Sequence, residues 1–376
     1  MKKLNPATRI ALALAALVGL AIGCMPLQDA INNALGVEVI GTTPSSNFAQ
    51  NGGINFSMLG DGAGETAKPE DVKVEVLNDD GTYSECKYVS DELKEGSDFN
   101  SLALLIDDSG SMERTYPESE YPGLCPTCPH DPDRLRAKAS EQLIKAVLAE
   151  APESRLALMD FGPTIDAGLL GTHVLMDFTS DSSQLLQALN QVDGSQEAGT
   201  PLWDSLADQV GSTATEAKEF EDILLLAGRT DETGKPIAVK RFIVVLSDGD
   251  DRNSETHTLE SVIELARTQD VVIHAIGLGP AAAENKDPRL QVEEQIVTVQ
   301  NLQTLAEKTG GFYASVHDPD ALEVLYKEVA RSLTEGYLSA EYSCRPNGEI
   351  PASGQFVTGR ITNADGTTSE WTMIAP

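Results

Sequence analysis

The sequence predicts an α/β protein whose doubly wound, mostly parallel sheet is inserted between two β-rich flanking segments. Between residues 100 and 336, short apolar runs alternate with amphipathic segments of helical period, which is typical of a parallel sheet with helices on both faces. The segments on either side, 53–99 and 337–376, show strand-type alternation and turn signals instead. Each flank is too short to bury much apolar surface alone, so we expect them to form one small β-sandwich.

The first residues have the pattern of an export signal. Three basic residues among the first nine precede an apolar run over 10–22, which is short for a membrane span. Leu-Ala-Ile-Gly-Cys, residues 20–24, resembles the lipobox of bacterial lipoproteins, in which the Cys becomes the lipidated first residue. We therefore expect a signal peptide over 1–23 and a lipid anchor on Cys24 in the bacterial envelope. An ordinary secretory signal is the alternative. Because Met25 is not Asp, enterobacterial sorting rules favour the outer membrane over the inner.

The flanking segments follow the signal and close the chain. Residues 24–52 are polar, Gly/Asn/Ser-rich and without sustained period, and are interpreted as a tether. Asp71–Val76 alternates so that three valines share one face, which predicts a strand, and Gly53–Met58 is a weaker strand candidate. Strands are predicted after Gly336 over Tyr337–Cys344, Gln355–Thr362 and Ser369–Ala375.

The inserted segment, 100–336, contains the apolar strands and the helices. Strands are predicted over Ser101–Asp107, Arg155–Gly162, Gly171–Phe178, the run from Lys240 into the acidic turn at 248–251, Val271–Gly279 and Gly310–Val316. Helices are predicted over Asp133–Ala151, Ser182–Gln191, a segment opening at Pro201, Leu259–Thr268, Leu302–Lys308 and Pro319–Thr334.

Cysteine usage fits an exported protein. Besides Cys24 there are four cysteines, and an even count in an oxidising compartment indicates disulfides with three possible pairings. We expect Cys86 to pair with Cys344, one from each flanking segment, and Cys125 to pair with Cys128 as a staple in a Pro-rich loop. A zinc site or a redox dithiol at the second pair are the alternatives.

Polar side chains follow two of the predicted strands. Asp107, Ser109 and Ser111 follow the first strand, Asp248 follows a later one, and Thr200 stands at a helix start between them. Because the carboxyl ends of inner parallel strands meet at one sheet edge, these oxygens should gather there. Two clustered carboxylates repel each other unless a cation lies among them. Hard oxygen ligands suit Mg²⁺, Mn²⁺ or Ca²⁺ better than zinc or copper.

Together the motifs resemble the von Willebrand factor type A domain. Asp-x-Ser-x-Ser after a buried strand, Gly-Thr-Pro-Leu-Trp-Asp-x-Leu and Ser-Asp-Gly occur in family order between Asn100 and Gly336. The resemblance implies a complete metal-ion-dependent adhesion site with Asp107, Ser109, Ser111, Thr200 and Asp248 as metal ligands. It also implies protein binding, because the ion's open position accepts a Glu or Asp of a partner. In relatives such as integrin domains, binding is coupled to movement of the last helix, here Pro319–Thr334.

The composition and the motifs of the chain also bear on other functions. A net charge of −32, from 59 acids and 27 bases, argues against nucleic acid as a partner. No Gly-x-Ser-x-Gly elbow, His-Glu-x-x-His motif or phosphate-binding Gly-Lys loop is present, so we expect no enzyme activity. Metal-assisted phosphoester hydrolysis with Asp107 and Asp248, or a structural envelope lipoprotein with an idle metal site, are the alternatives.

Three acidic residues and a long insert lie next to the metal motifs in the sequence. Asp108, Asp250 and Asp251 are expected to be solvated neighbours of the site and not ligands. The insert Glu113–Asp133, which contains His130 and the Cys125–Cys128 pair, lies between the metal loop and the first helix. It is therefore expected to hang over the site. A capped turn without metal is the alternative reading of the first motif.

Overall fold

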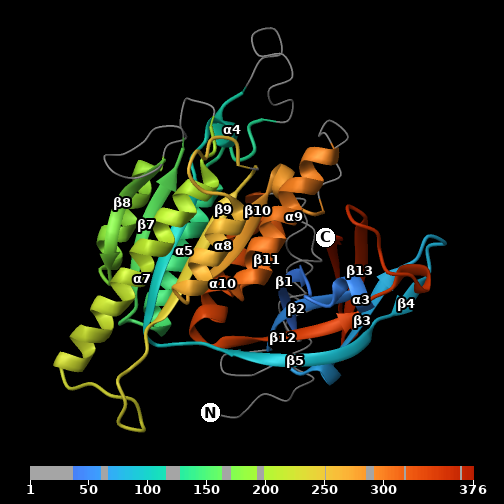
Figure 1. Ribbon diagram of the computed structural model, residues 1–376, viewed down its shortest axis with the longest axis horizontal. Helices are drawn as coiled ribbons and strands as arrows, with labels where there is room; N and C mark the ends of the chain where they lie inside the picture. The colour runs from blue at the N-terminus through green and yellow to red at the C-terminus, as the bar shows by residue number, and fades with distance from the viewer. Residues whose placement is uncertain are drawn as a thin grey trace, which may run out of the picture. The chain divides into compact units, whose positions relative to one another are not determined.

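The inserted segment forms a central sheet that contains six strands among the described residues (Figure 1). These are β6 (Asn100–Asp107), β7 (Arg155–Phe161), β8 (Thr172–Thr179), β9 (Lys240–Ser247), β10 (Val272–Leu278) and β11 (Tyr313–Val316). Their order across the sheet is β11-β10-β9-β6-β7-β8. Neighbouring strands run parallel except β8, which is antiparallel to β7. The prediction of a mostly parallel sheet is therefore confirmed.

The computed structural model describes residues 37–60, 67–115, 128–162, 171–192, 199–249, 251–284, 292–316, 319–364 and 366–376. The predicted signal peptide and Cys24 lie outside these ranges. Gly36–Pro376 forms one compact unit. Within the described ranges, no helix combines the length and the apolar character that crossing a membrane requires.

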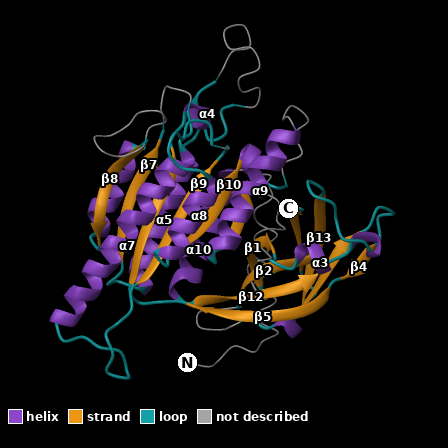
Figure 2. Ribbon diagram, in the orientation of Figure 1, coloured by secondary structure: helices purple, strands orange, loops and turns teal. Residues whose placement is uncertain are grey.

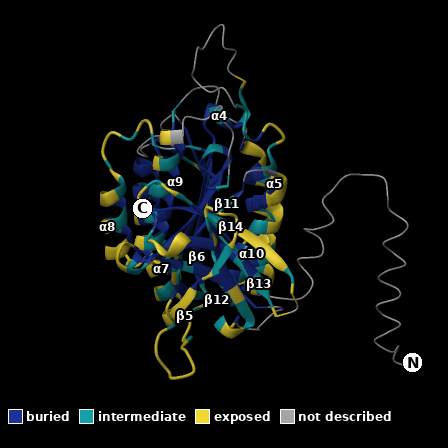
Figure 3. Cartoon of the chain, turned by 90° about the vertical axis from the view of Figure 1, so that its right-hand side faces the viewer, coloured by how far each residue is buried: buried dark blue, intermediate teal, exposed yellow. Residues whose placement is uncertain are grey.

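Helices cover both faces of the sheet (Figure 2). They are α5 (Leu135–Glu150), α6 (Ser182–Ala188) and α10 (Leu322–Thr334) on one face, and α7 (Leu202–Leu226), α8 (Leu259–Thr268) and α9 (Val292–Thr309) on the other. The alternation of β6 decides which residues meet which helices. Leu104 and Ile106 pack in the cluster of α5 and α10, whereas Ala103 and Leu105 pack in the cluster of α7, α8 and α9. Every residue of β6 is buried as a result, and the interior of Figure 3 is dark blue.

The order in which the chain adds strands to the sheet reverses at one place, between β6 and β9. From β6 it runs outward through β7 to β8, and it then returns to β9 on the other side of β6 before continuing to β10 and β11. The carboxyl ends of β6 and β9 are therefore neighbours from which the connections leave in opposite directions. Such a switch point is where open α/β sheets bind ligands.

The flanking segments form two antiparallel sheets, each with four strands in the described ranges. One sheet has the order β1-β2-β12-β5 and the other β14-β13-β3-β4. Their bounds are β1 (Glu38–Pro44), β2 (Gly53–Leu59), β3 (Val72–Leu77), β4 (Tyr83–Glu85), β5 (Lys87–Glu95), β12 (Gly336–Ser343), β13 (Phe356–Asn363) and β14 (Thr368–Ile374). One apolar core joins the two sheets, and Phe56 of β2 meets Trp371 of β14 edge-on at 5.1 Å between ring centroids. The two sequence-distant flanks thus pack as a sandwich.

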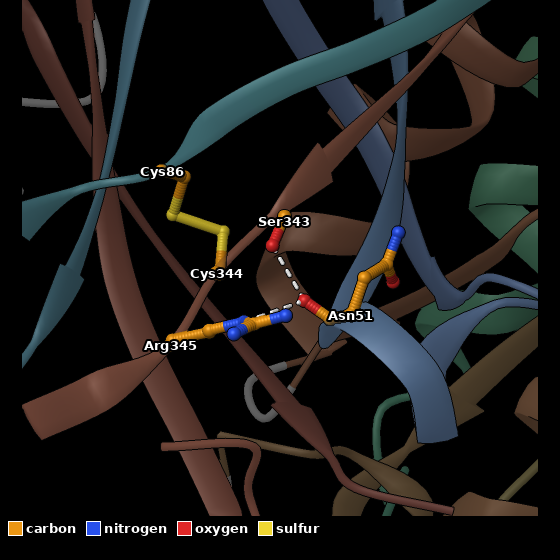
Figure 4. Close-up of a disulfide and its surroundings, with 5 residues drawn as sticks. All are labelled: Asn51, Cys86, Ser343, Cys344 and Arg345. Carbon is orange, nitrogen blue, oxygen red and sulfur yellow. Dashed lines mark hydrogen bonds between the residues drawn. A yellow bond between two sulfur atoms is a disulfide. The ribbon is translucent and has the colours of Figure 1, made fainter. Parts of the chain in front are cut away.

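A disulfide ties the two flanking segments together. Cys86, just before β5, is bonded to Cys344, just after β12, at a sequence separation of 258 (Figure 4). Close by, Ser343 Oγ and Arg345 Nε both donate to the carbonyl oxygen of Asn51. The pairing predicted from the sequence is present in the structure. Cys128 is also disulfide-bonded, and Cys125, its predicted partner, lies outside the described residues.

The prediction of a tether up to residue 52 is wrong for its last part. Residues 38–44 form β1, which pairs with β2, and Phe48–Asn51 forms the short helix α3. The strand was missed because Gly and Pro interrupt its β-branched residues. Gly41 is needed there, since a Cβ at this position would come within 2.5 Å of the carbonyl oxygen of Tyr313 in β11.

Two further strands and part of a helix were also missed. β5 was not predicted because nearly all of its residues are exposed, so the strand has no apolar period. β4 has only three residues. The helix α9 begins at residue 292, ten residues before the predicted start, because its first turns show no sustained apolar stripe.

Candidate metal centre

Two of the predicted ligands stand at the switch point of the sheet. Asp107 is the last residue of β6, and Asp248 directly follows β9. In the parallel pair of these strands Ile106 lies opposite Leu246. The next residue of β9, Ser247, donates a hydrogen bond from Oγ to Asp107 Oδ2 over 2.7 Å. The carboxylates of the first and third motifs are therefore brought to one edge by strand pairing.

The loop after β6 continues the contacts from one carboxylate to the other. Asp107 Oδ1 accepts the backbone N–H of Ser109 at 2.9 Å. The short helix α4 (Gly110–Glu113) then turns Ser111 back, so that its Oγ lies 3.0 Å from Ser109 Oγ. Ser111 Oγ donates to Asp248 Oδ1 at 3.1 Å. Four of the five predicted ligands thus form one continuous chain of contacts.

The fifth, Thr200, is held against the loop that follows Asp248. Its backbone N–H donates to Asn253 Oδ1 at 3.1 Å, and the side chain is buried. Asp204, four residues later in the same motif, is also buried. Its carboxylate accepts three consecutive backbone N–H groups, those of residues 255–257, at 2.7–3.2 Å. Asp204 therefore anchors the loop after β9 to the start of α7, which places Thr200 beside this loop.

The site concentrates negative charge away from water. Asp107 is fully buried, and Asp248 is 2% exposed. Burial, together with the charge of Asp248, raises the pKa of the Asp107 carboxyl to about 7 from its ordinary value of 3.8. Hydrogen bonds from Ser109 and Ser247 act in the opposite direction. The two carboxylates therefore repel each other at neutral pH, and a cation between them would relieve this repulsion.

The donor set fits a hard divalent cation. It offers two carboxylates and three hydroxyls, from Ser109, Ser111 and Thr200, and these are the oxygen ligands that Mg²⁺, Mn²⁺ and Ca²⁺ accept. In the described part of the chain, no cluster of three or more His, Cys, Asp or Glu side chains forms a metal site. A site with only two carboxylates is consistent with this result.

Sequence reasoning missed His130, the residue from the insert that contacts the site. His130 Nδ1 lies 2.6 Å from Asp248 Oδ2. In the sequence His130 stands two residues after Cys128, where it suggests at most a ligand of the alternative zinc site. No periodicity or spacing connects it to Asp248, which is 118 residues away.

The expectation that Asp108 is solvated is wrong. Asp108 is 6% exposed, and its carboxylate pairs with the guanidinium of Arg136, whose side chain is completely buried. The guanidinium forms ion pairs with Asp108, Glu113 and Asp131 at 2.9, 2.6 and 2.9 Å. Because a buried cation needs neutralisation, Arg136 collects carboxylates from both ends of the insert.

The other two neighbouring acids differ from each other. Asp251 is half-buried and accepts the backbone N–H of Trp203 at 3.2 Å, so it too supports the start of α7. Asp250 lies outside the described residues.

The chain is similar to one protein family and to solved structures. A family model, von Willebrand factor type A domain, matches residues 101–328. A search of curated proteins finds no match. Many solved structures are similar, and the three that follow are of low identity. The SpRpn10 VWA domain is 17% identical, with 60% of this chain and 93% of that chain covered and a TM-score of 0.36. The von Willebrand factor type A protein from Catenulispora acidiphila is 12% identical, with coverages of 91% and 71% and a TM-score of 0.41. The open conformation of the pilus adhesin SpaC from Lactobacillus rhamnosus GG is 10% identical, with coverages of 89% and 54% and a TM-score of 0.41, so the match spans about half of that adhesin.

Proposed function

The chain belongs to the von Willebrand factor type A family, and from this premise we propose that it is a metal-dependent protein-binding module of the bacterial envelope. Type A domains are typically interaction modules. The observation that carries the proposal is the contact chain from Asp107 through Ser109 and Ser111 to Asp248, at the switch point of the sheet. Five oxygen-bearing side chains from three loops support metal binding, and the switch point supports access for a ligand.

The residues of the site have distinct roles in this proposal. Ser109, Ser111 and Thr200 would hold the ion through neutral hydroxyls, and Asp107 and Asp248 would supply the charge. Mg²⁺ is the expected ion, with Mn²⁺ or Ca²⁺ as alternatives. The metal, when bound, supplies an electrophilic position that a Glu or Asp carboxylate of a partner can occupy. The small number of anionic ligands favours such a partner, because two carboxylates leave the ion able to accept a third.

The location at the envelope is part of the same proposal. The lipobox-like sequence supports an anchor on Cys24, and Met25 favours the outer membrane over the inner. The Cys86–Cys344 disulfide supports export, because such bonds persist in oxidising compartments. Hydrolysis of phosphoesters by the same carboxylates would also need a positively charged side chain that faces the phosphate of the substrate. The nearby guanidinium of Arg136 is already paired with three carboxylates, which favours binding over catalysis.

The test measures capture of envelope proteins by the immobilised chain in magnesium or in chelator. A peptide carrying Glu should compete for the captured protein, whereas its Gln counterpart should not. The matched control is Asp107→Asn, because the Asn side chain has nearly the same shape as that of Asp but carries no charge. This variant should capture nothing specific. Capture that is equal in magnesium and chelator would contradict the proposal. Turnover of a phosphoester that is lost in Asp107→Asn would favour the enzyme instead. Metal binding without any carboxylate-dependent capture would favour the idle structural site.

A further inference from the structure

The Asp248 carboxylate is held from two sides. Its Oδ1 accepts the hydroxyl of Ser111 from the loop after β6, and its Oδ2 lies 2.6 Å from His130 Nδ1 at the end of the insert. The histidine side chain is 8% exposed and that of Asp248 is 2% exposed. A contact this short between two buried side chains fixes the orientation of the carboxylate.

The backbone of the insert delivers His130 to this place. The N–H of His130 donates to the carbonyl oxygen of Ser111 at 3.1 Å, and the N–H of Asp131 donates to that of Met112 at 2.8 Å. The returning end of the insert therefore runs along the metal loop. Asp131 also accepts the N–H groups that begin α5 and the guanidinium of Arg136, so the segment is anchored on its other side.

A glycine at the end of β10 leaves room for the imidazole ring. Gly279 has a φ of +56°, and a Cβ at this position would come 3.3 Å from His130 Cγ. The ring thus lies between Asp248, in the loop after β9, and the turn after β10. This packing restricts the ring to one orientation, with Nδ1 toward Asp248.

We propose that His130 is a positioning residue of the metal centre, which donates from Nδ1 to Asp248 Oδ2 and holds this carboxylate in place for the cation. The inference rests on the proposed function. Carboxylates that bind metals commonly have such outer partners, and their loss typically weakens metal binding about 10–100-fold. The insert then has a role in the site, because it supplies a residue that the three family motifs lack.

The test uses Mn²⁺ as the probe and measures its affinity for the full chain by calorimetric titration at one fixed pH. His130→Ala should weaken binding about 10–100-fold. Asn places an N–H donor close to the position of Nδ1, whereas Gln places it close to that of Nε2. His130→Asn should therefore restore most of the affinity, and His130→Gln should not. His173→Ala is the matched control, because His173 Nδ1 makes a similar 2.7 Å contact with Asp160 across the β7–β8 pair.

The outcomes separate this inference from the proposed function. If wild type binds Mn²⁺, Asp107→Asn does not, and His130→Ala binds as well as wild type, the inference fails and the proposed function stands. If Asn and Gln at position 130 behave alike, the ring only fills space and the inference also fails. If folded wild type shows no heat of Mn²⁺ binding, both fail. Thermal unfolding of each variant in chelator checks that it is folded.

Discussion

The hydroxyl of Ser111 donates a hydrogen bond to Asp248 Oδ1 over 3.1 Å, although the sequence separation of the two residues is 137. The contact exists because β6 and β9 are parallel neighbours and the loops that follow them leave the same edge of the sheet. Strand pairing therefore brings the two carboxylates together, and the loops that leave the same edge add the hydroxyls.

Asp107→Asn is expected to remove metal binding and to stabilise the metal-free fold. The pKa of Asp107 is raised to about 7, so its ionisation above that pH opposes folding. Asn keeps the contacts with Ser109 and Ser247 without the charge. In chelator at pH 8 the free energy of unfolding should rise by about 1–3 kcal/mol. Denaturant titration with chelator and with magnesium measures both effects, and a less stable metal-free variant would contradict this account.

Arg136→Met is expected to destabilise the fold by about 3–5 kcal/mol, because it leaves three carboxylates without their buried cation. The matched control is Lys145→Met on the same helix. The side chain of Lys145 is half exposed and pairs with Glu141, so its loss should cost less than about 1 kcal/mol. Urea unfolding of both variants compares the two costs. Equal costs would mean that the buried cluster is not a stabilising unit.

Replacing Cys86 and Cys344 together by Ala is expected to lower the free energy of unfolding by ~4 kcal/mol or more, because the bond closes a very long loop in the unfolded chain. Fluorescence of Trp371, which lies in the sandwich core, is a suitable probe for this region. The comparison is denaturant unfolding of wild type and the double variant. A loss well under 1 kcal/mol would show that native packing alone holds the two segments together.

Glu38→Gln is expected to stabilise the protein at pH 8. Burial of the Glu38 carboxyl, and the nearby charge of Glu328 on α10, raise its pKa from 4.5 to about 7. The folded state therefore holds this proton more tightly, and stability is lost as the pH rises from about 4.5 through 7. The Gln variant should show a flatter pH dependence over this range and be more stable by about 1–3 kcal/mol above it. Thermal unfolding at several pH values provides the measurement.

The sequence was most informative where burial or a motif left a pattern. The continuous apolar runs of β6 and β9 predicted inner strands, and the residues directly after them predicted the site. β5 and β1 were not predicted, because one is exposed along its length and the other is interrupted by Gly and Pro. Edge strands of this kind are specified by their neighbours and not by their own periodicity.

The contacts around the site could not be predicted for a different reason. Asp108 looked like a solvated neighbour because nothing in the sequence marks Arg136, 28 residues later, as its buried partner. His130 reaches Asp248 only because the insert returns along the metal loop. Both contacts depend on where a long connection ends in space, and neither spacing nor composition encodes this position.

The most direct test of the central claim is the anomalous scattering of manganese in crystals of the chain soaked with millimolar Mn²⁺. We predict a peak at the carboxyl ends of β6 and β9, about 2–2.3 Å from the hydroxyl oxygens of Ser109 and Ser111. The peak should be absent in crystals of Asp107→Asn and reduced in those of Thr200→Ala. A wild-type crystal with no manganese peak beside these residues, or with manganese only elsewhere, would contradict the account.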